Sequence, residues 1–119
     1  MHARSLLGRD GEAAACELYR RLGFEIVDRN YRAGRGEIDV VARRGETVVF
    51  CEVKTRRSDQ WGLPAEAVGP AKQAQLRRLA AAWLAERQPG YVEVRFDIVS
   101  VIVRDGTTET EITHIPDAF

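Results

Sequence analysis

Apolar residues recur at helical spacing in two parts of the chain. The first part, residues 9–22, ends before Gly23, a residue that commonly terminates helices. Its expected core positions are Ala15, Leu18 and Leu22. The second part begins near Pro70, which suits a first helical turn, and ends at Pro89-Gly90. Its apolar stripe consists of Leu76, Leu79, Ala80, Trp83 and Leu84.

Segments rich in β-branched and aromatic residues predict strands. They cover residues 24–30, 36–41, 49–55, 92–103 and 111–115. Residues 31–35 and 56–64 are predicted loops, and Asp105-Gly106 predicts a turn before the last strand. The order α-β-β-β-α-β-β indicates an α/β fold in which helices flank a mixed β-sheet.

The short break at residues 44–46 separates two of these strands and predicts a β-hairpin. We expect a two-residue turn whose first residue is glycine. Continuing the strand pairing from such a turn places Asp39 directly opposite Glu52. In the same register, Glu37 lies opposite Lys54.

The opposed Asp39 and Glu52 side chains suggest a cation site. Directly opposed residues have Cβ atoms about 4.5–5.5 Å apart, and like charges there destabilise a sheet. Two carboxylates at about 5 Å repel by roughly 3 kcal/mol at an effective dielectric constant near 20. A hard divalent cation with oxygen ligands would turn this repulsion into binding. Lys54, two residues after Glu52 on the same face, adds an ammonium group, a combination that suggests phosphoryl chemistry.

Other interpretations of these residues remain open. The pattern Glu-x-Lys is short and occurs by chance in many proteins. Glu37 and Lys54 can also form an ordinary cross-strand ion pair on a solvent-facing hairpin. A three-residue loop would place Asp39 opposite Cys51 and turn the two carboxylates toward opposite faces of the sheet. That register would abolish the cation site.

Length and composition indicate one globular domain spanning residues 1–119. Hydrophobic residues make up 45% of the chain and charged residues 30%, which excludes wholesale disorder. The sequence shows no signal segment and no run of about 18 apolar residues, so we expect a cytoplasmic protein without a membrane partner.

Cysteine and histidine are too few to define a disulfide framework or a zinc site. Cys16 and Cys51 fall in apparent helix and strand segments, so we expect both to be reduced core residues. Oxygen ligands therefore remain the better basis for a metal site.

The formal net charge is zero, which argues against a protein that coats nucleic acid by charge alone. The charges are unevenly distributed, because residues 1–87 hold 16 Lys or Arg against 12 Asp or Glu. Arginine, whose planar group binds phosphate in two places, accounts for most of the basic residues.

Several motifs together resemble the YraN-like family of small bacterial proteins, which is related to archaeal Holliday junction resolvases within the restriction-endonuclease-like superfamily. They are Gly11-Glu12, Gly36-Glu37-Ile38-Asp39, Glu52-Val53-Lys54-Thr55-Arg56, Lys72, Arg95-Phe96-Asp97 and Ala118-Phe119. The resemblance covers nearly the whole chain and is much more specific than Glu-x-Lys alone. It implies a restriction-endonuclease-like fold.

The resemblance also implies roles for individual residues. Asp39 and Glu52 would bind Mg²⁺ or Mn²⁺, and Lys54 would orient the attacking water or stabilise charge on the phosphate. Glu12 matches a position where resolvase relatives carry a further acidic residue near the metal. Without the resemblance, Glu12 is better explained as a solvated residue in the first turn of a helix, where it suits the helix dipole.

Candidate nucleic-acid contacts lie beyond the Glu-x-Lys motif. Arg56, Arg57 and Trp61 form a basic and aromatic segment suited to phosphate contacts and base stacking, although solvated arginines and a core tryptophan explain it equally well. Lys72, near the start of the second predicted helix, is either a phosphate contact or an ordinary exposed lysine. Asp97 lies among apolar residues, and we expect it to brace an arginine or a backbone group.

The resulting hypothesis is a metal-dependent DNA endonuclease, with branched or structured DNA as partner because zero net charge disfavours indiscriminate duplex binding. A non-catalytic nucleic-acid-binding or adaptor module that retains the nuclease fold is the alternative. A third interpretation treats the charged hairpin as surface only. Resolvase relatives act as symmetric dimers, so a homodimer is a further possibility, for which the sequence identifies no face.

Overall fold

The computed structural model describes residues 3–57, 68–103 and 110–119, and it describes only the helical backbone of residues 3–10. The elements are α1 (Ala3–Arg21), β1 (Glu25–Arg32), β2 (Glu37–Arg44), β3 (Thr47–Arg57), α2 (Pro70–Arg87), β4 (Glu93–Val103) and β5 (Thr110–Ile115). This α/β order is the predicted one, and it is compatible with a restriction-endonuclease-like fold. The predicted turn at Asp105-Gly106 lies outside the described residues.

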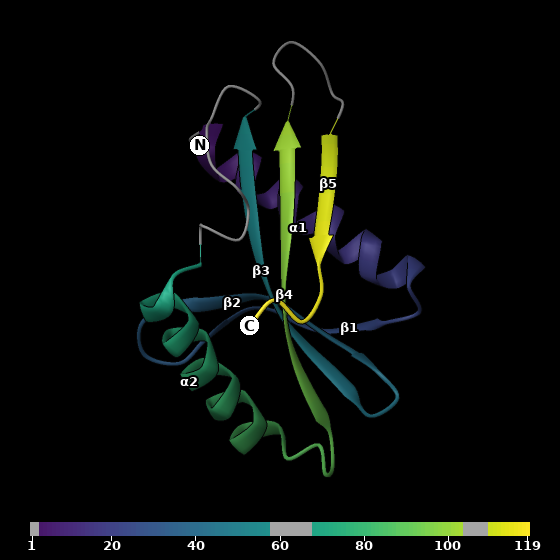
Figure 1. Cartoon of the computed structure of the whole chain (residues 1–119), viewed down its shortest axis with the longest axis vertical. Coiled ribbons are helices and arrows are strands. Elements are labelled where there is room, and N and C mark those ends of the chain that lie inside the picture. The colour runs from purple at the N-terminus through teal and green to yellow at the C-terminus, as the bar shows by residue number, and fades with distance from the viewer. Residues whose placement is uncertain (1–2, 58–67, 104–109) are drawn as a thin grey trace.

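The strands form one mixed sheet in the spatial order β1-β2-β3-β4-β5. Among the described strands, only β3 and β4 pair in parallel. This is because α2 carries the chain back to the end of the sheet at which β3 begins, and β4 starts there. The sheet is strongly twisted, so that β1 and β2 cross β3 and β4 at a steep angle near the middle of the molecule (Figure 1). The helices lie on opposite faces, α1 behind the sheet and α2 in front.

The core on the α1 side is small and tightly packed. Ala15, Cys16 and Tyr19 of α1 are buried against Val40, Val49, Cys51, Val99 and Val101 of the sheet. Both cysteines are free and buried, as predicted. The prediction for Leu22 is wrong, because α1 ends at Arg21 and the Leu22 side chain is 42% exposed. Tyr19, one turn after Cys16, is instead the buried core residue nearest the end of α1.

The core on the α2 side follows the predicted stripe. Leu76, Leu79, Ala80 and Trp83 are buried and pack with Phe50, Phe96 and Ile98 of the sheet. Leu84 is only partly buried. The helix begins at Pro70 and ends before Gln88, which adopts the left-handed conformation and donates its backbone N–H to the Leu84 carbonyl oxygen. Among the described residues, no helix combines the length and apolar character needed to cross a bilayer.

The β2–β3 hairpin has the predicted turn. Gly45 has φ +59°, and Arg44 pairs with Thr47 across the two-residue turn. The antiparallel pairs continue in the predicted register as far as Val40 with Cys51. The alternative three-residue loop, which would place Cys51 opposite Asp39, is therefore excluded. Pairing ends one position before the expected Asp39–Glu52 pair.

Two strands extend further than the sequence predicts. β1 continues through Tyr31 and Arg32, which the sequence assigns to a loop, because these residues pair with Ile38 and Glu37 of β2. β3 likewise continues through Arg57, since the β-branched residues of β4 provide parallel partners up to Val103. Arg56 and Arg57 are thus strand residues and not loop residues; Trp61 lies outside the described residues.

Asp97 anchors the end of the chain to the centre of the sheet. Its fully buried carboxylate accepts hydrogen bonds from the Tyr19 hydroxyl (2.7 Å), from Arg95 Nε and Nη2 (2.9 Å each) and from the Asp117 backbone N–H (3.0 Å). His114 Nε2 lies 2.8 Å from the same carboxylate. The expectation that Asp97 braces an arginine and a backbone group is confirmed.

Candidate metal centre

Asp39 lies where β2 and β3 stop pairing. Its Oδ2 accepts a hydrogen bond of 2.7 Å from the Val53 backbone N–H. If the β2–β3 ladder continued, this N–H would bond to a backbone carbonyl oxygen, and the Asp39 side chain takes the place of that acceptor. The side chain is only 7% exposed. Burial, reinforced by the nearby Glu52 carboxylate, raises the pKa of Asp39 to about 8. The local structure thus holds an acidic group in a place that disfavours its negative charge.

Two further glutamates approach Asp39. Carboxylate oxygens of Glu12, Glu37 and Asp39 all lie within 4.8 Å of one another. Glu12 comes from α1, whereas Glu37 precedes Asp39 by two residues on β2. Burial raises the pKa of Glu12, the Asn30 side chain opposes this by hydrogen bonding, and the Glu37 charge raises it further. We refer to these three residues as the acidic triad.

Glu52 lies beside the acidic triad and is not a member of it. Its side chain is 9% exposed, and its charge contributes to the raised pKa values of both Asp39 and Glu12. The Oε2 atom is buried and accepts no hydrogen bond within the described part of the chain. Lys72 Nζ, from the first turn of α2, lies 3.5 Å from this oxygen, too far for a well-formed hydrogen bond. A buried carboxylate oxygen with so weak a partner fits a role as a ligand of a cation.

The acidic triad and Glu52 suit a hard divalent cation. Carboxylate oxygens from two strands and one helix converge here, and Mg²⁺, Mn²⁺ and Ca²⁺ all favour oxygen ligands. Both cysteines face the α1-side core, so soft thiolate ligands are not part of the set. The residues present therefore fit the ion that the sequence motifs imply. We call the acidic triad and Glu52 together the candidate metal centre.

The structure brings most of the predicted catalytic residues together. Asp39, Glu52 and Glu12 all belong to the candidate metal centre. Lys54 is exposed and lies two residues after Glu52 on β3, on the same face by strand alternation. Among the predicted nucleic-acid contacts, Lys72 adjoins Glu52. Arg56 and Arg57 occupy the far end of β3, where Arg56 is half-buried and Arg57 exposed.

Two expectations about these charges are wrong. Glu37 does not pair with Lys54, because β2 and β3 have separated at that point, and its Oε2 instead accepts a hydrogen bond of 3.1 Å from Arg32 Nε. Glu12 is not a solvated residue of a first helical turn, because α1 begins at Ala3 and the Glu12 side chain is only 15% exposed. It faces the sheet and not the solvent.

Glu37 is the member of the acidic triad that sequence reasoning missed. The sequence predicts Glu37 as a partner of Lys54 and as part of the Gly36-Glu37-Ile38-Asp39 motif, but not as a metal ligand. The signal that could have identified it is the spacing Glu37-x-Asp39, since residues two apart on a strand face the same side.

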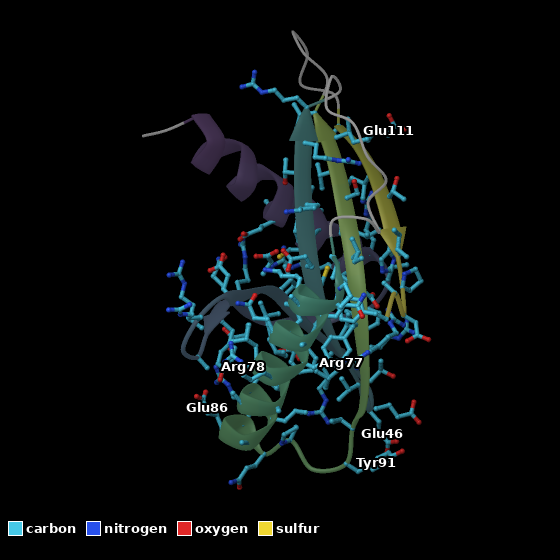
Figure 2. The ribbon with its side chains drawn as sticks, turned by 60° about the vertical axis from the view of Figure 1, so that its left-hand side comes forward. Glu46, Arg77, Arg78, Glu86, Tyr91 and Glu111 are labelled. Atoms are coloured by element: carbon cyan, nitrogen blue, oxygen red, sulfur yellow. The ribbon has the colours of Figure 1, made fainter. Side chains whose placement is uncertain are left out.

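Helix α2 fixes the segment that leads into the acidic triad. Arg78 Nη1 donates to the Ala33 carbonyl oxygen at 3.2 Å, and its Nη2 donates to the Arg35 carbonyl oxygen at 3.0 Å. Figure 2 shows Arg77 and Arg78 leaving α2 in different directions, Arg77 toward β4 and Arg78 toward β1 and β2. Gly36 has φ +83°, a left-handed conformation that favours glycine, and a Cβ there would also require the Gln75 amide to move.

Gly11 lets α1 approach β3 closely enough to present Glu12. A Cβ at Gly11 would collide with the Thr55 hydroxyl. Alanine at an exposed helix position stabilises by about 1 kcal/mol relative to glycine, but overpacking costs about 1–3 kcal/mol. We therefore expect Gly11→Ala to lower the free energy of unfolding by about 1–2 kcal/mol, measured by urea denaturation.

Thr55→Ala and the double variant provide the control for this prediction. If the collision causes the loss, Gly11→Ala costs less in the Thr55→Ala background than in the wild type. An equal cost in both backgrounds would attribute the loss to the helix itself.

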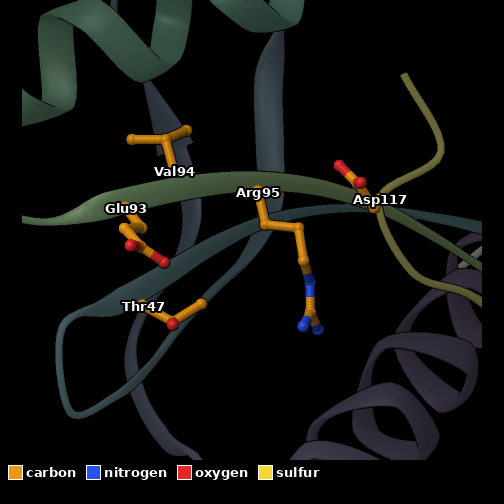
Figure 3. Close-up of a pocket in the computed structure, with 5 residues that line it drawn as sticks. All are labelled: Thr47, Glu93, Val94, Arg95 and Asp117. Carbon is orange, nitrogen blue, oxygen red and sulfur yellow. The ribbon is translucent and has the colours of Figure 1, made fainter.

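A pocket of about 270 Å³ lies away from these carboxylates. It is lined by Thr47, Glu93, Val94, Arg95 and Asp117 at the opposite end of β3 and β4 (Figure 3). Arg95, the one cationic residue among these five, already forms an ion pair with Asp97. The pocket contains no residue of the candidate metal centre.

Comparison with known proteins gives a family but no activity. The family model described as "Uncharacterised protein family UPF0102" matches residues 11–101, a span that includes all four carboxylates of the candidate metal centre. A UPF0102 protein of Frankia casuarinae is 46% identical over 119 residues, covering 100% of both chains. One of Paenarthrobacter aurescens is 47% identical, covering 97% of this chain and 94% of the relative. One of Streptomyces griseus is 50% identical, covering 93% and 95%. The family resemblance expected from the motifs is confirmed.

Proposed function

The chain belongs to the uncharacterised protein family UPF0102, and we propose that it is a metal-dependent endonuclease that hydrolyses phosphodiester bonds in branched or structured DNA. The observation that carries this proposal is the convergence of the acidic triad within 4.8 Å beside the buried Glu52. Gathering four acids, of which Asp39 and Glu52 are buried, costs stability unless a cation compensates for them. A protein that only needed the fold would be more stable without them.

The residues have distinct roles in this proposal. Glu12, Glu37, Asp39 and Glu52 would hold Mg²⁺ or Mn²⁺, an ion that polarises a phosphate and lowers the pKa of a bound water. Lys54 is exposed beside the metal centre and would donate to the phosphate oxygens that gain charge during cleavage. The Val53 N–H holds the Asp39 carboxylate in place through the 2.7 Å hydrogen bond. Gly11 and Gly36 allow α1 and α2 to position the remaining acids.

Structured DNA is the substrate class that suits the charge distribution. The formal net charge of zero supplies little general attraction to duplex DNA. Exposed arginines instead lie on or beside β1, at Arg29, Arg32 and Arg35, and the first two pair with acids of the triad. Cations confined to one region favour a substrate that reaches them by its shape over general attraction to any duplex.

The proposal is tested with flap, fork, four-way, single-stranded and duplex DNAs incubated with Mg²⁺ or Mn²⁺. We expect cleavage of at least one branched DNA, and a loss of about a hundredfold or more in Glu52→Gln. Glu46→Gln, which removes an exposed carboxylate in the hairpin turn, is the matched control and should retain wild-type activity. Metal-independent binding without product would favour the adaptor module. Equal nicking by wild type and Glu52→Gln would indicate a contaminating nuclease.

A further inference from the structure

Three cationic side chains lie against the acids of the candidate metal centre. Arg29 Nη2 is 3.9 Å from Glu12 Oε1, and Arg32 Nε is 3.1 Å from Glu37 Oε2. Lys72 Nζ is 3.5 Å from Glu52 Oε2. Each glutamate thus has its own cation, and these cations come from β1 and α2, on either side of the acidic triad. We refer to Arg29, Arg32 and Lys72 as the cation rim.

The cation rim is held only weakly. The Arg29, Arg32 and Lys72 side chains are 41%, 74% and 36% exposed, respectively. Exposed ion pairs of this kind contribute little to stability, so their long side chains can leave the carboxylates at small cost. Each carboxylate is less exposed than its cation, at 9% for Glu52, 15% for Glu12 and 30% for Glu37. The acids are therefore fixed while the cations can move.

We propose that divalent metal binding releases the cation rim to bind DNA phosphates, so that metal and DNA strengthen each other's binding. This inference rests on the proposed metal-dependent function and concerns how that site is regulated. In the metal-free protein the glutamates neutralise Arg29, Arg32 and Lys72, which are then poor phosphate ligands. A bound divalent cation offsets two negative charges of the carboxylates, which weakens their attraction for the rim, and the ion itself repels the rim. The released guanidinium and ammonium groups point into solvent beside the metal centre, where a phosphate backbone would lie.

An observation independent of the acidic triad supports a ligand here. Glu52 Oε2 is buried without a hydrogen bond, and Lys72 Nζ, its nearest cation, stays 3.5 Å away. A lysine whose only purpose was to neutralise Glu52 would be expected to close this gap to about 2.8 Å. Lys72 also lies in the first turn of α2, where the helix dipole disfavours a cation. Both features favour the release of Lys72 from Glu52.

The coupling is reciprocal by linkage, so it can be measured from the DNA side alone. The probe is a labelled four-way junction, with the corresponding linear duplex for comparison, titrated with full-length protein in EDTA or in saturating Ca²⁺. In the wild type, Ca²⁺ is expected to tighten binding about tenfold or more. The slope of log affinity against log salt concentration should steepen by about 2–3, since each phosphate contact contributes about 0.9.

The decisive variant is Arg29→Gln/Arg32→Gln/Lys72→Gln, which removes the rim and leaves all four carboxylates. It should still bind Ca²⁺ in a calorimetric titration, yet its Ca²⁺-dependent gain in DNA affinity should be at least about fivefold smaller than that of the wild type. The matched control removes three cations elsewhere and should behave as the wild type. It carries Arg20→Gln, Arg21→Gln and Arg43→Gln.

An equal Ca²⁺-dependent gain in wild type and rim variant would overturn the proposal, as would a wild type that binds DNA equally well in EDTA and in Ca²⁺. Such results would mean that any ion effect arises from direct contact between metal and phosphate. Cleavage is not measured here, so the absence of DNA cleavage would count against the proposed function and not against this coupling.

Discussion

Replacing Asp39 by asparagine is expected to stabilise the metal-free protein by about 2 kcal/mol at pH 9 and to weaken Mn²⁺ binding by at least about tenfold. The wild-type carboxylate is 7% exposed and lies beside Glu52, so at pH 9 the folded protein contains two buried negative charges. Asparagine removes one of them. Its amide oxygen can still accept the hydrogen bond from the Val53 N–H, so the local backbone should not change.

The sign of this prediction follows from how the stability of the wild-type protein depends on pH. Asp39 titrates near 3.9 in the unfolded chain, whereas its folded pKa is about 8. Between these values the unfolded chain has released the proton and the folded protein has kept it, so wild-type stability falls as the pH rises. Above pH 8 both states are ionised and the loss is complete.

Urea denaturation in EDTA at pH 4, 6 and 9 measures this effect. The free energy of unfolding of Asp39→Asn relative to wild type should increase from pH 4 to pH 9. Saturating Mn²⁺ should narrow the difference at pH 9, since it stabilises the wild type more than the variant, which binds the ion more weakly. A variant that is less stable than wild type at pH 9 in EDTA would show that the Asp39 charge is already compensated by the protein itself.

The sequence alone predicts those elements whose structure depends mainly on residues near one another in the chain. Helix α2 begins at Pro70 as predicted, and the two-residue glycine turn determines the β2–β3 register through Val40 and Cys51. A two-residue turn leaves only one register, so the approach of Asp39 and Glu52 could be anticipated. Their interaction survives in the structure even though the backbone pairing ends before them.

Features that depend on other elements could not be anticipated. Glu37 turned toward Asp39 because β2 separates from β3 and pairs with β1, where Arg32 lies opposite. Glu12 reaches the acids because α1 starts at Ala3 and passes β3 closely at Gly11, a contact with no local signature. The extension of β3 through Arg57 required β4 as a parallel partner from a distant part of the chain.

Removing the Asp97 carboxylate is expected to have the opposite effect on stability. Asp97→Ala should lower the free energy of unfolding by about 3–5 kcal/mol at pH 7. The residue is fully buried, and its loss would leave Tyr19 and Arg95 without their acceptor and detach the Asp117 backbone. Burial alone would raise the pKa of Asp97, but the hydrogen bonds from Arg95, His114, Tyr19 and the Asp117 N–H lower it overall. Its contribution is therefore present above about pH 4 and is lost as the pH falls through the lowered folded pKa.

Tyr19→Phe distinguishes the contribution of the Asp97 charge from that of a single hydrogen bond, because it removes one donor and keeps the carboxylate. It should cost about 1 kcal/mol, well below the loss in Asp97→Ala, with both measured by urea denaturation at pH 7. Mn²⁺ affinity should be unchanged in Tyr19→Phe, since its hydroxyl bonds Asp97 and not the acidic triad. If Asp97→Ala were as stable as the wild type, its hydrogen bonds would not offset the burial of its charge. Asp97 would then resemble Asp39, an acid that destabilises the metal-free fold.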